Sequence, residues 1–229
     1  PFLRIQDPGN DSPLDFRNGD TITLEAWVQP TKFKEGTNVY IIGKGRTGNT
    51  GTDPNNQNWA LRVRVSGGIG CLSFLFRDER NAGDASWHRW TTTSGFSAGE
   101  QWHHVALSYS FGKPDSIRGY INGVPLPGKW DMGGPSTAGP VVDNDEAWIG
   151  SAIRGQADPT FPGRIDEVAI YRHALSPERI KLHATRADAL PALKSAKIVA
   201  SKSAPNAPPA PPVPAPVIPL DEVPGGQVR

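Results

Sequence analysis

The sequence is poor in cysteine, in long apolar runs and in net charge, and each shortage excludes a class of protein. Cys71 is the single cysteine among 229 residues, so no disulfide can form within the chain. It lies in the apolar run 69–76, which predicts a core thiol rather than a nucleophile. No apolar run reaches the roughly 20 residues of a membrane-spanning helix, which predicts no membrane insertion. The formal net charge is +1 and basic residues are scattered, so nucleic acid is not an expected partner.

Glycine and proline, in contrast, are abundant, with 25 and 23 residues. Many glycines separate short β-type runs, as is typical of a turn-rich β protein. Many prolines lie after about residue 187, where an alanine- and proline-rich composition favours extended polyproline II. We therefore predict one domain over residues 1–186 and an extended linker or tail over 187–229. A ligand for a proline-binding module is the alternative for the tail. The opening residues PFLRI resemble the interior of a strand, so we expect a fragment of a longer protein.

About ten short strands and one short helix are predicted, with turn signals between them. The clearest alternation lies in segment 59–66, where Leu61, Val63 and Val65 face one way and Arg62 and Arg64 the other. Segments 78–101 and 123–146 read as polar or glycine-rich loops. The spacing of the turns favours an all-β sandwich over βαβ units. The predicted strands are 2–5, 21–29, 38–43, 59–66, 69–77, 103–111, 117–122, 147–152 and 161–172.

The last predicted strand leads into a helix and contains an unexpected charge. Ser176 is placed as the helix N-cap, with Pro177 at the first helical position and Glu178 in the first turn. Asp166 lies in the middle of an otherwise apolar strand, where a charge has to be paired or bound. Strict alternation would place Asp166 and Glu167 on opposite faces.

Three tryptophans in the predicted loops are candidate ligand-binding residues. Trp87, Trp90 and Trp130 could stack on sugar rings through their π faces, with His88 and Arg89 beside them. We predict a binding rim from these five residues. The alternative is that the loop folds back over the sandwich and buries its tryptophans, since tryptophan is usually mostly buried.

The succession of strands resembles laminin-G-like domains of the concanavalin A-like lectin/glucanase superfamily, in the bacterial type found in large secreted multidomain proteins. The strongest pieces are WHHVA at 102–106, YING at 120–123 and the stretch 163–177. The resemblance covers residues 1 to about 186. It implies an antiparallel jelly-roll β-sandwich, neighbouring domains on the same polypeptide, and export to an extracellular, periplasmic or cell-surface location.

The same resemblance implies a structural Ca²⁺ ion, because several members of the superfamily hold one. In related laminarinase-like enzymes an aspartate on the last strand is a ligand, and Asp166 occupies the similar place here. Ca²⁺ takes six to eight oxygen ligands, and Asp7 and Asp20 lie in early segments that could supply others. The alternative is that Asp166 accepts hydrogen bonds from backbone N–H groups or arginine at the sheet edge.

A catalytic site is not expected. Retaining glycosidases of this superfamily display two carboxylates on one strand face with E-x-D-x-x-E spacing, and no segment of the sequence has it. We predict a non-catalytic recognition module that binds carbohydrate or a protein surface. The alternatives are a structural spacer between catalytic or redox domains, and a degenerate glycoside hydrolase.

Overall fold

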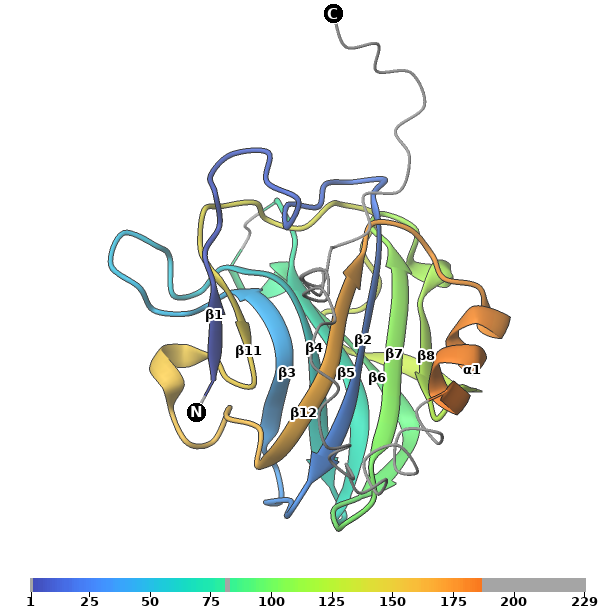
Figure 1. Cartoon of the computed structure of the whole chain (residues 1–229). Helices are drawn as coiled ribbons and strands as arrows, with labels where there is room; N and C mark the ends of the chain where they lie inside the picture. Colours follow the sequence, from blue (N-terminus) through green and yellow to red (C-terminus); the bar gives the residue numbers. More distant parts are fainter. Residues whose placement is uncertain (1, 81–82, 187–229) are drawn as a thin grey trace, which may run out of the picture.

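The computed structural model describes residues 2–80 and 83–186, which form two antiparallel β-sheets packed face to face with one helix outside them (Figure 1). The sequence-based prediction of an all-β jelly-roll sandwich with a short C-terminal helix is confirmed. The predicted linker 187–229 lies outside the described residues. No helix within the described part of the chain is long and apolar enough to cross a membrane.

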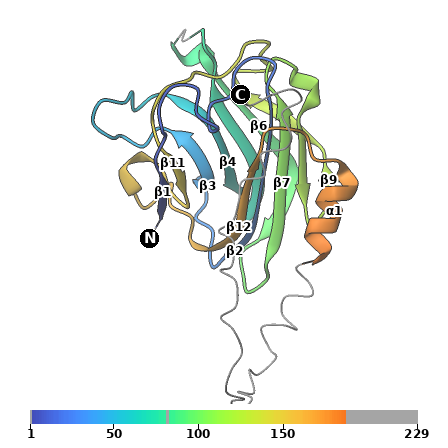
Figure 2. The ribbon, with the colours of Figure 1, turned by 45° about the horizontal axis from the view of Figure 1, so that its top comes forward.

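One sheet has seven strands in the order β1-β11-β3-β4-β5-β6-β10, and the other has five in the order β12-β2-β7-β8-β9. Figure 2 shows β2, β7 and β12 in front of the larger sheet. The strands are β1 (Leu3–Ile5), β2 (Thr21–Pro30), β3 (Asn38–Gly45), β4 (Gln57–Ser66), β5 (Ile69–Arg77), β6 (Trp87–Ser97), β7 (His103–Ser110), β8 (Arg118–Ile121), β9 (Val124–Leu126), β10 (Gly128–Met132), β11 (Ala147–Ile149) and β12 (Gly163–Tyr171). Short 3₁₀ turns cover Gly83–Ser86, Pro114–Ser116 and Ile153–Gly155, and α1 covers Pro177–Arg186.

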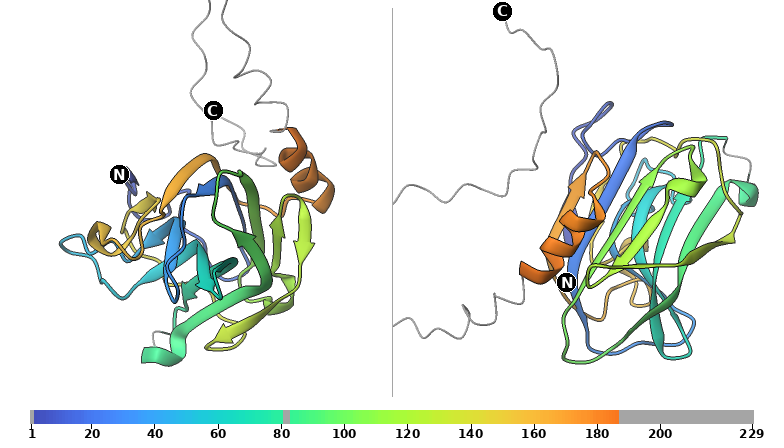
Figure 3. Two further views of the ribbon diagram at one scale, coloured as in Figure 1. Left: turned by 90° about the horizontal axis from the view of Figure 1, so that it is seen from below. Right: turned by 90° about the vertical axis from the view of Figure 1, so that its right-hand side faces the viewer.

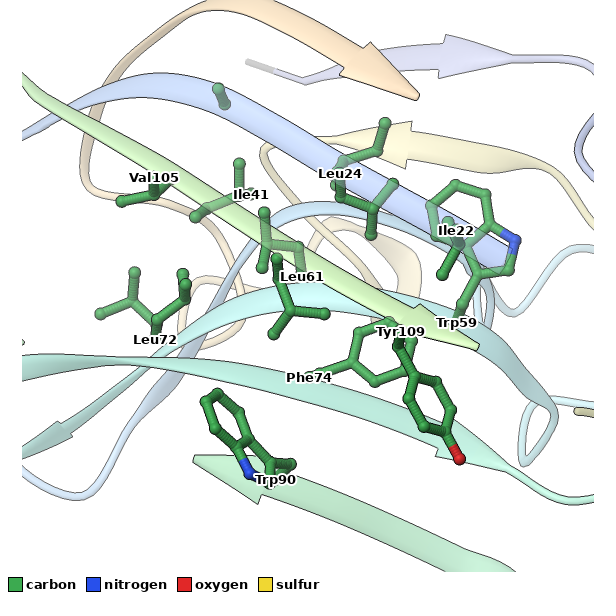
Figure 4. Close-up of a cluster of buried hydrophobic side chains, with 14 of the residues drawn as sticks. Ile22, Leu24, Ile41, Trp59, Leu61, Leu72, Phe74, Trp90, Val105 and Tyr109 are labelled. Carbon is green, nitrogen blue, oxygen red and sulfur yellow. The ribbon is translucent and has the colours of Figure 1, made fainter. Parts of the chain in front are cut away.

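The core fills the space between the two sheets. Alternate residues of both sheets point inward, including Leu24 of β2, Leu61 of β4, Phe74 of β5 and Val105 of β7, each with no exposed surface (Figure 4). The Trp59 indole N–H donates to the Leu14 carbonyl at 2.9 Å, so its polar atom is satisfied inside the core. The outward residues of the same strands are therefore free to form a second surface, which carries the candidate site.

Strands β6, β9 and β10 occupy segments that the sequence pattern assigned to loops, so that part of the prediction is wrong. The inward positions of β6 include His88 and Thr92 as well as Trp90, which removes the apolar alternation. The Thr92 hydroxyl accepts the Leu72 backbone N–H at 2.9 Å. A long-range partner of this kind is invisible in the sequence.

A β-bulge interrupts β12 where strict alternation was predicted. The pairing with β2 shifts between Asp166 and Ala169, and Glu167 has φ of 50°. Ile165, Val168 and Ile170 pack against the core. Asp166 and Glu167 are both exposed, so the expectation that they face opposite sides of the sheet is wrong.

Helix α1 packs against the outer side of the five-stranded sheet (Figure 3). The Ser176 hydroxyl accepts the Arg179 backbone N–H at 3.2 Å, which confirms the predicted N-cap. Ile180 is fully buried in a cluster with Ala106 and Tyr120. The helix therefore covers apolar surface that the sheet would otherwise expose.

Candidate functional site

The outer side of the seven-stranded sheet carries a group of arginines. Trp59, Leu61 and Val63 of β4 point into the core, so the alternate residues of that strand point outward. Arg77 of β5 pairs with Trp87 of β6, and Arg46 directly follows β3. We call this surface the arginine face, defined by Arg46, Arg62, Arg64, Arg77 and Arg89.

Apolar side chains form the floor between these arginines. Tyr40, Ala60 and Leu75 make a separate buried cluster on this side of the sheet, and Tyr40 and Leu75 are each 2% exposed. Met132 and Ile153 pack against the same cluster from β10 and from the 3₁₀ turn. The apolar side chains that stay partly exposed over this cluster are Trp87, Met132 and Ile153, so the face presents apolar surface beside positive charge.

Arg62 is the unusual residue of the arginine face. Its side chain is almost buried, with 4% exposure, and within the described part of the chain neither Nε nor Nη2 has a hydrogen-bond partner. Burial lowers the pKa of the Arg62 guanidinium; the interaction with Tyr40 opposes this shift, and the charges of Arg89 and Arg46 act with burial. Buried charges in proteins are normally paired, and these two atoms have almost no accessible surface, so the incompletely partnered guanidinium is a cost to the folded state.

The carboxylates near this face are already engaged. Asp131 accepts a hydrogen bond from Arg89 Nε at 2.7 Å and lies 3.7 Å from Arg64 Nε. Asp53 lies 3.7 Å from an Nη1 atom of Arg77. Both acids neutralise the margins of the face rather than its centre at Arg62.

The ring of Trp87 is in contact with two arginines of the arginine face. The guanidinium carbons of Arg46 and Arg77 lie 5.1 and 5.8 Å from its ring centroid, and that of Arg62 lies 5.4 Å from the ring of Tyr40. These cation–π contacts hold the rings and the charges in fixed relative positions. Ordered rings beside ordered charges are what a binding surface needs.

The backbone beside this face is strained. Ile153 and Arg154 have φ of 52° and 58°, in the left-handed region that a β-branched residue rarely adopts. The Ile153 N–H donates to the Arg46 carbonyl at 2.9 Å, and the Arg154 N–H to the Thr47 carbonyl at 2.8 Å. Strain of this kind persists where the surroundings enforce it, often next to ligand sites.

Two residues of the predicted binding rim are buried, so the rim does not form as predicted. His88 is 1% exposed and has Asp78 Oδ2 and the Gly134 carbonyl oxygen each 2.9 Å from its ring nitrogens. Trp90 is 5% exposed in the core. It packs so closely that a Cβ on Gly128 would lie 2.2 Å from its ring. The physical reason is the alternation of β6, which points both side chains inward.

The other rim residues separate onto two sides of the sheet. The Trp130 ring points toward the core, with its centroid 5.8 Å from that of Tyr109 and 6.3 Å from that of Phe76. Trp87 and Arg89 are partly exposed on the arginine face. Ligand binding by these residues stays a prediction. The sequence could have predicted only part of the arginine face. The alternation in segment 59–66 separates Arg62 and Arg64 from the core, but Arg89 can be placed on the same face only once β6 is known to be a strand.

The three carboxylates predicted to bind Ca²⁺ lie in three different environments. Asp7 forms an ion pair with the buried ammonium of Lys44. Asp20 Oδ2 accepts the Arg17 backbone N–H at 2.8 Å and lies 3.2 Å from Arg172 Nη2. Asp166 is exposed, and its Oδ1 accepts the Glu167 N–H at 2.9 Å.

These residues do not fit a shared metal site. Over residues 2–80 and 83–186, no three His, Cys, Asp or Glu side chains come together in a way that could hold a metal ion. Structural Ca²⁺ stays a prediction, without a ligand set among the residues that the sequence assigned to it. Cys71 is partly exposed on the outer side of β5, so the expectation of a core thiol is wrong.

A pocket lies at one end of the sandwich. We call it the end cavity, with a volume of about 370 Å³. The His103 ring lies over Phe96 with 4.6 Å between centroids, and burial lowers the pKa of His103. The lining side chains are otherwise uncharged. They come from Gly95, Phe96, Ser97, Ala98, Gly99, Gln101, His103, Ile121 and Asn122.

Comparisons with known proteins agree with this architecture. The chain is similar to the binding domain of Paraclostridial Mosquitocidal Protein 1, at 13% identity and a TM-score of 0.54. The matched region is 81% of this chain and 43% of that one. It is also similar to the CBM40 of a Ruminococcus gnavus IT-sialidase bound to α2,6 sialyllactose, at 14% identity and a TM-score of 0.50. The matched region is 78% of this chain and 94% of that one. These likenesses show the fold.

No curated protein matches the chain. The family model described as the concanavalin A-like lectin/glucanases superfamily matches residues 8–181, a span that contains every strand except β1, together with the first half of α1. The chain therefore belongs to the concanavalin A-like lectin/glucanases superfamily.

Proposed function

We propose that this chain is a carbohydrate-recognition module that binds its ligand on the arginine face. The observation that carries the proposal is the partly exposed ring of Trp87, which has the guanidinium carbons of Arg46 and Arg77 at 5.1 and 5.8 Å from its centroid. Met132 and Ile153, also partly exposed, pack against the same apolar cluster. Arginine supplies directional donors to sugar oxygens, and an aromatic floor supplies contact for the apolar C–H faces of sugar rings.

Family membership supports a ligand-binding role. The superfamily is described by its lectins and glucanases, and the similar CBM40 was solved with a bound sialylated sugar. A fold hosts many functions, so the argument depends on the residues of the face.

We propose further that the module is not an enzyme. Glycoside hydrolysis needs two carboxylates that can act as acid, base or nucleophile. Asp131 and Asp53, the carboxylates beside the arginine face, are in ion pairs with arginines. Both carboxylates are therefore engaged with arginine side chains rather than placed to serve as an acid, base or nucleophile.

Export is proposed together with this function, since glycans are displayed mainly outside the cell. We propose that the chain works beside other domains of the same polypeptide. The arginine face has a second possible ligand, a protein surface, which a glycan-binding experiment separates from the first.

A glycan array followed by calorimetry tests the proposal. We expect the wild-type chain to bind at least one glycan class, and Trp87→Ala to weaken binding at least tenfold, because the ring of Trp87 and its stacked arginines belong to the face. Trp102→Ala is the matched control. Trp102 is exposed, at 36%, and lies outside the arginine face, between Gln101 and His103 of the end cavity.

Three outcomes would contradict parts of the proposal. Absence of binding to every glycan would leave the spacer role as the better account. Loss of binding in Trp102→Ala but not in Trp87→Ala would move the site to the end cavity. Hydrolysis of a bound glycan would contradict the non-catalytic part.

A further inference from the structure

The end cavity contains an imidazole of which only one nitrogen is engaged with the protein. His103 Nδ1 lies 3.3 Å from the Nδ2 atom of Asn122. Within residues 2–80 and 83–186, His103 Nε2 has no hydrogen-bond partner, and it is not among the unpartnered side-chain atoms that burial closes off from solvent. A ligand in the cavity can therefore reach this nitrogen.

The hydrogen bonds of Asn122 determine which nitrogen of His103 carries the proton. Asn122 Oδ1 accepts the His104 backbone N–H at 2.9 Å, so the amide presents its NH₂ group to His103. Nδ1 is then the acceptor, and the neutral ring carries its hydrogen on Nε2. Burial lowers the pKa of His103, which favours the neutral ring at pH 7. His103 thus offers the cavity one N–H donor and no charge.

Asn122 is itself held in place from two sides. With Gly123 it forms the two-residue turn between β8 and β9, with φ of 52° and 75°, as in a type I′ hairpin. Its backbone N–H donates to the His104 carbonyl at 2.7 Å. A Cβ on Gly123 would lie 2.9 Å from the Cα atom of Lys181, so α1 packs directly on the turn. The donor of His103 is therefore positioned before a ligand arrives.

The rest of the end cavity supplies apolar surface and uncharged polar groups. Phe96 and Ile121 contribute buried apolar side chains to its lining. Ser97 and Gln101 contribute exposed side chains with a hydroxyl and an amide. The volume of about 370 Å³ lies near the lower end of the roughly 300–1,000 Å³ that is usual for small-molecule sites. The cavity therefore suits a small ligand with several polar groups and no charge.

We propose that the end cavity is a second binding site, which takes an uncharged sugar residue and in which His103 Nε2–H donates to a sugar oxygen. This goes beyond the proposed function, because it adds a site apart from the arginine face. The side chains of Ser97, Gln101 and Asn122 supply further donors and acceptors for hydroxyl groups. A carboxylated or phosphorylated ligand is disfavoured, because the lining contains no cation to balance its charge.

NMR of the histidine side chains tests the site in the intact chain. We would titrate the ¹⁵N-labelled chain with the methyl glycosides of glucose, galactose, mannose and N-acetylglucosamine. We expect His103 to be the Nε2–H tautomer at the start, and its imidazole signals to shift with at least one glycoside. Dissociation constants of about 1–10 mM are expected, because one sugar ring makes few contacts. The signals of His173, a half-buried histidine outside the end cavity, should not move.

The variant His103→Phe removes the donor and keeps an aromatic ring over Phe96. We expect it to weaken binding of the same glycoside roughly fivefold, the effect of one hydrogen bond, with little change in melting temperature. The backbone amide signals of Gln101 and Asn122 report binding in this variant. His173→Phe is the matched control and should bind as the wild type does. Trp87→Ala, which alters the arginine face, should also leave this binding unchanged.

The contradicting results differ from those of the proposed function. No shift of the His103 signals with any of the four glycosides would overturn the second site, even if the glycan array shows binding that depends on Trp87. Equal affinity of His103→Phe and the wild type would reject His103 as the donor. Tighter binding of glucuronic acid than of the methyl glucoside would overturn the preference for uncharged sugars. Loss of glycoside binding in Trp87→Ala would show that the two surfaces are not separate sites.

Discussion

Lys44 is a full positive charge placed where water does not reach. Its side chain has no exposed surface and forms ion pairs with Asp7 and Asp15. Its ammonium also donates to the Asp143 carbonyl at 2.6 Å. Oxygen atoms from three separate segments thus surround one cation, and Lys44 is the shared partner of the two buried carboxylates.

Replacing Lys44 should cost far more than replacing a surface lysine. We expect Lys44→Met to lower the free energy of unfolding by about 3–5 kcal/mol, because two buried carboxylates would lose their partner. The measurement is urea unfolding at neutral pH. Lys34→Met is the control, since Lys34 and Asp158 form an exposed pair and should change stability little. Equal effects of the two substitutions would contradict the role given to Lys44.

His88 shows at the same scale why the binding rim could not be identified correctly from sequence. A histidine beside tryptophans and an arginine is a reasonable binding motif when only neighbours in the chain are visible. The partners that explain its burial are Asp78, ten positions earlier, and the Gly134 carbonyl, 46 positions later. The sequence contains no signal for either contact.

At the scale of elements, strands with apolar inward positions were predictable and the others were not. β2 and β4 were placed to within two residues at either end, because alternating apolar residues fix both the strand and its buried face. β6 was missed because polar inward residues hide the period. The bulge in β12 was missed because Glu167 looks like an ordinary strand residue until its φ is known.

Helix α1 is attached to the sheet through a buried carboxylate. Glu25 of β2 accepts hydrogen bonds from Tyr171 at 2.8 Å and from His183 of α1 at 2.9 Å, and lies 3.5 Å from His104. Burial alone would raise the pKa of Glu25. The hydrogen bonds from His104, Tyr171 and His183 outweigh it and hold the pKa below the ordinary 4.5.

This carboxylate should make the stability of the chain depend on acid pH. Since the pKa is lower in the folded state, the unfolded state takes up the proton first as pH falls, and the contribution of Glu25 is lost through and below its depressed pKa. We expect Glu25→Gln to cost about 1–3 kcal/mol at pH 7, and we expect the cost to shrink below pH 4.5. Urea unfolding across pH measures it, with exposed Glu100→Gln as control. If the stability lost in Glu25→Gln did not change with pH, the ionised carboxylate of Glu25 would not be the source of the stabilisation.

At the scale of the whole molecule, the sandwich is closed by elements far apart in the sequence. β1 pairs with β11, and β2 lies between β12 and β7. The seven-stranded sheet therefore includes the first strand, β1, and the five-stranded sheet includes the last strand, β12. The prediction of one domain ending at residue 186 follows from the sequence pattern and is open to a direct test by truncation.

A chain ending at Arg186 should unfold as the full chain does. The buried clusters that hold the sheets and α1 lie within residues 14–184, so we expect the melting temperature to stay within about 2 °C, because core contacts set stability. A chain ending at Leu175 should melt lower, since it loses Ile180 and uncovers Ala106 and Tyr120. Differential scanning calorimetry of the full chain and the two shortened chains measures the three melting temperatures. A large loss of stability on cutting after Arg186 would show that the domain extends beyond it, and equal stability of the two shortened chains would show that α1 contributes nothing to the fold.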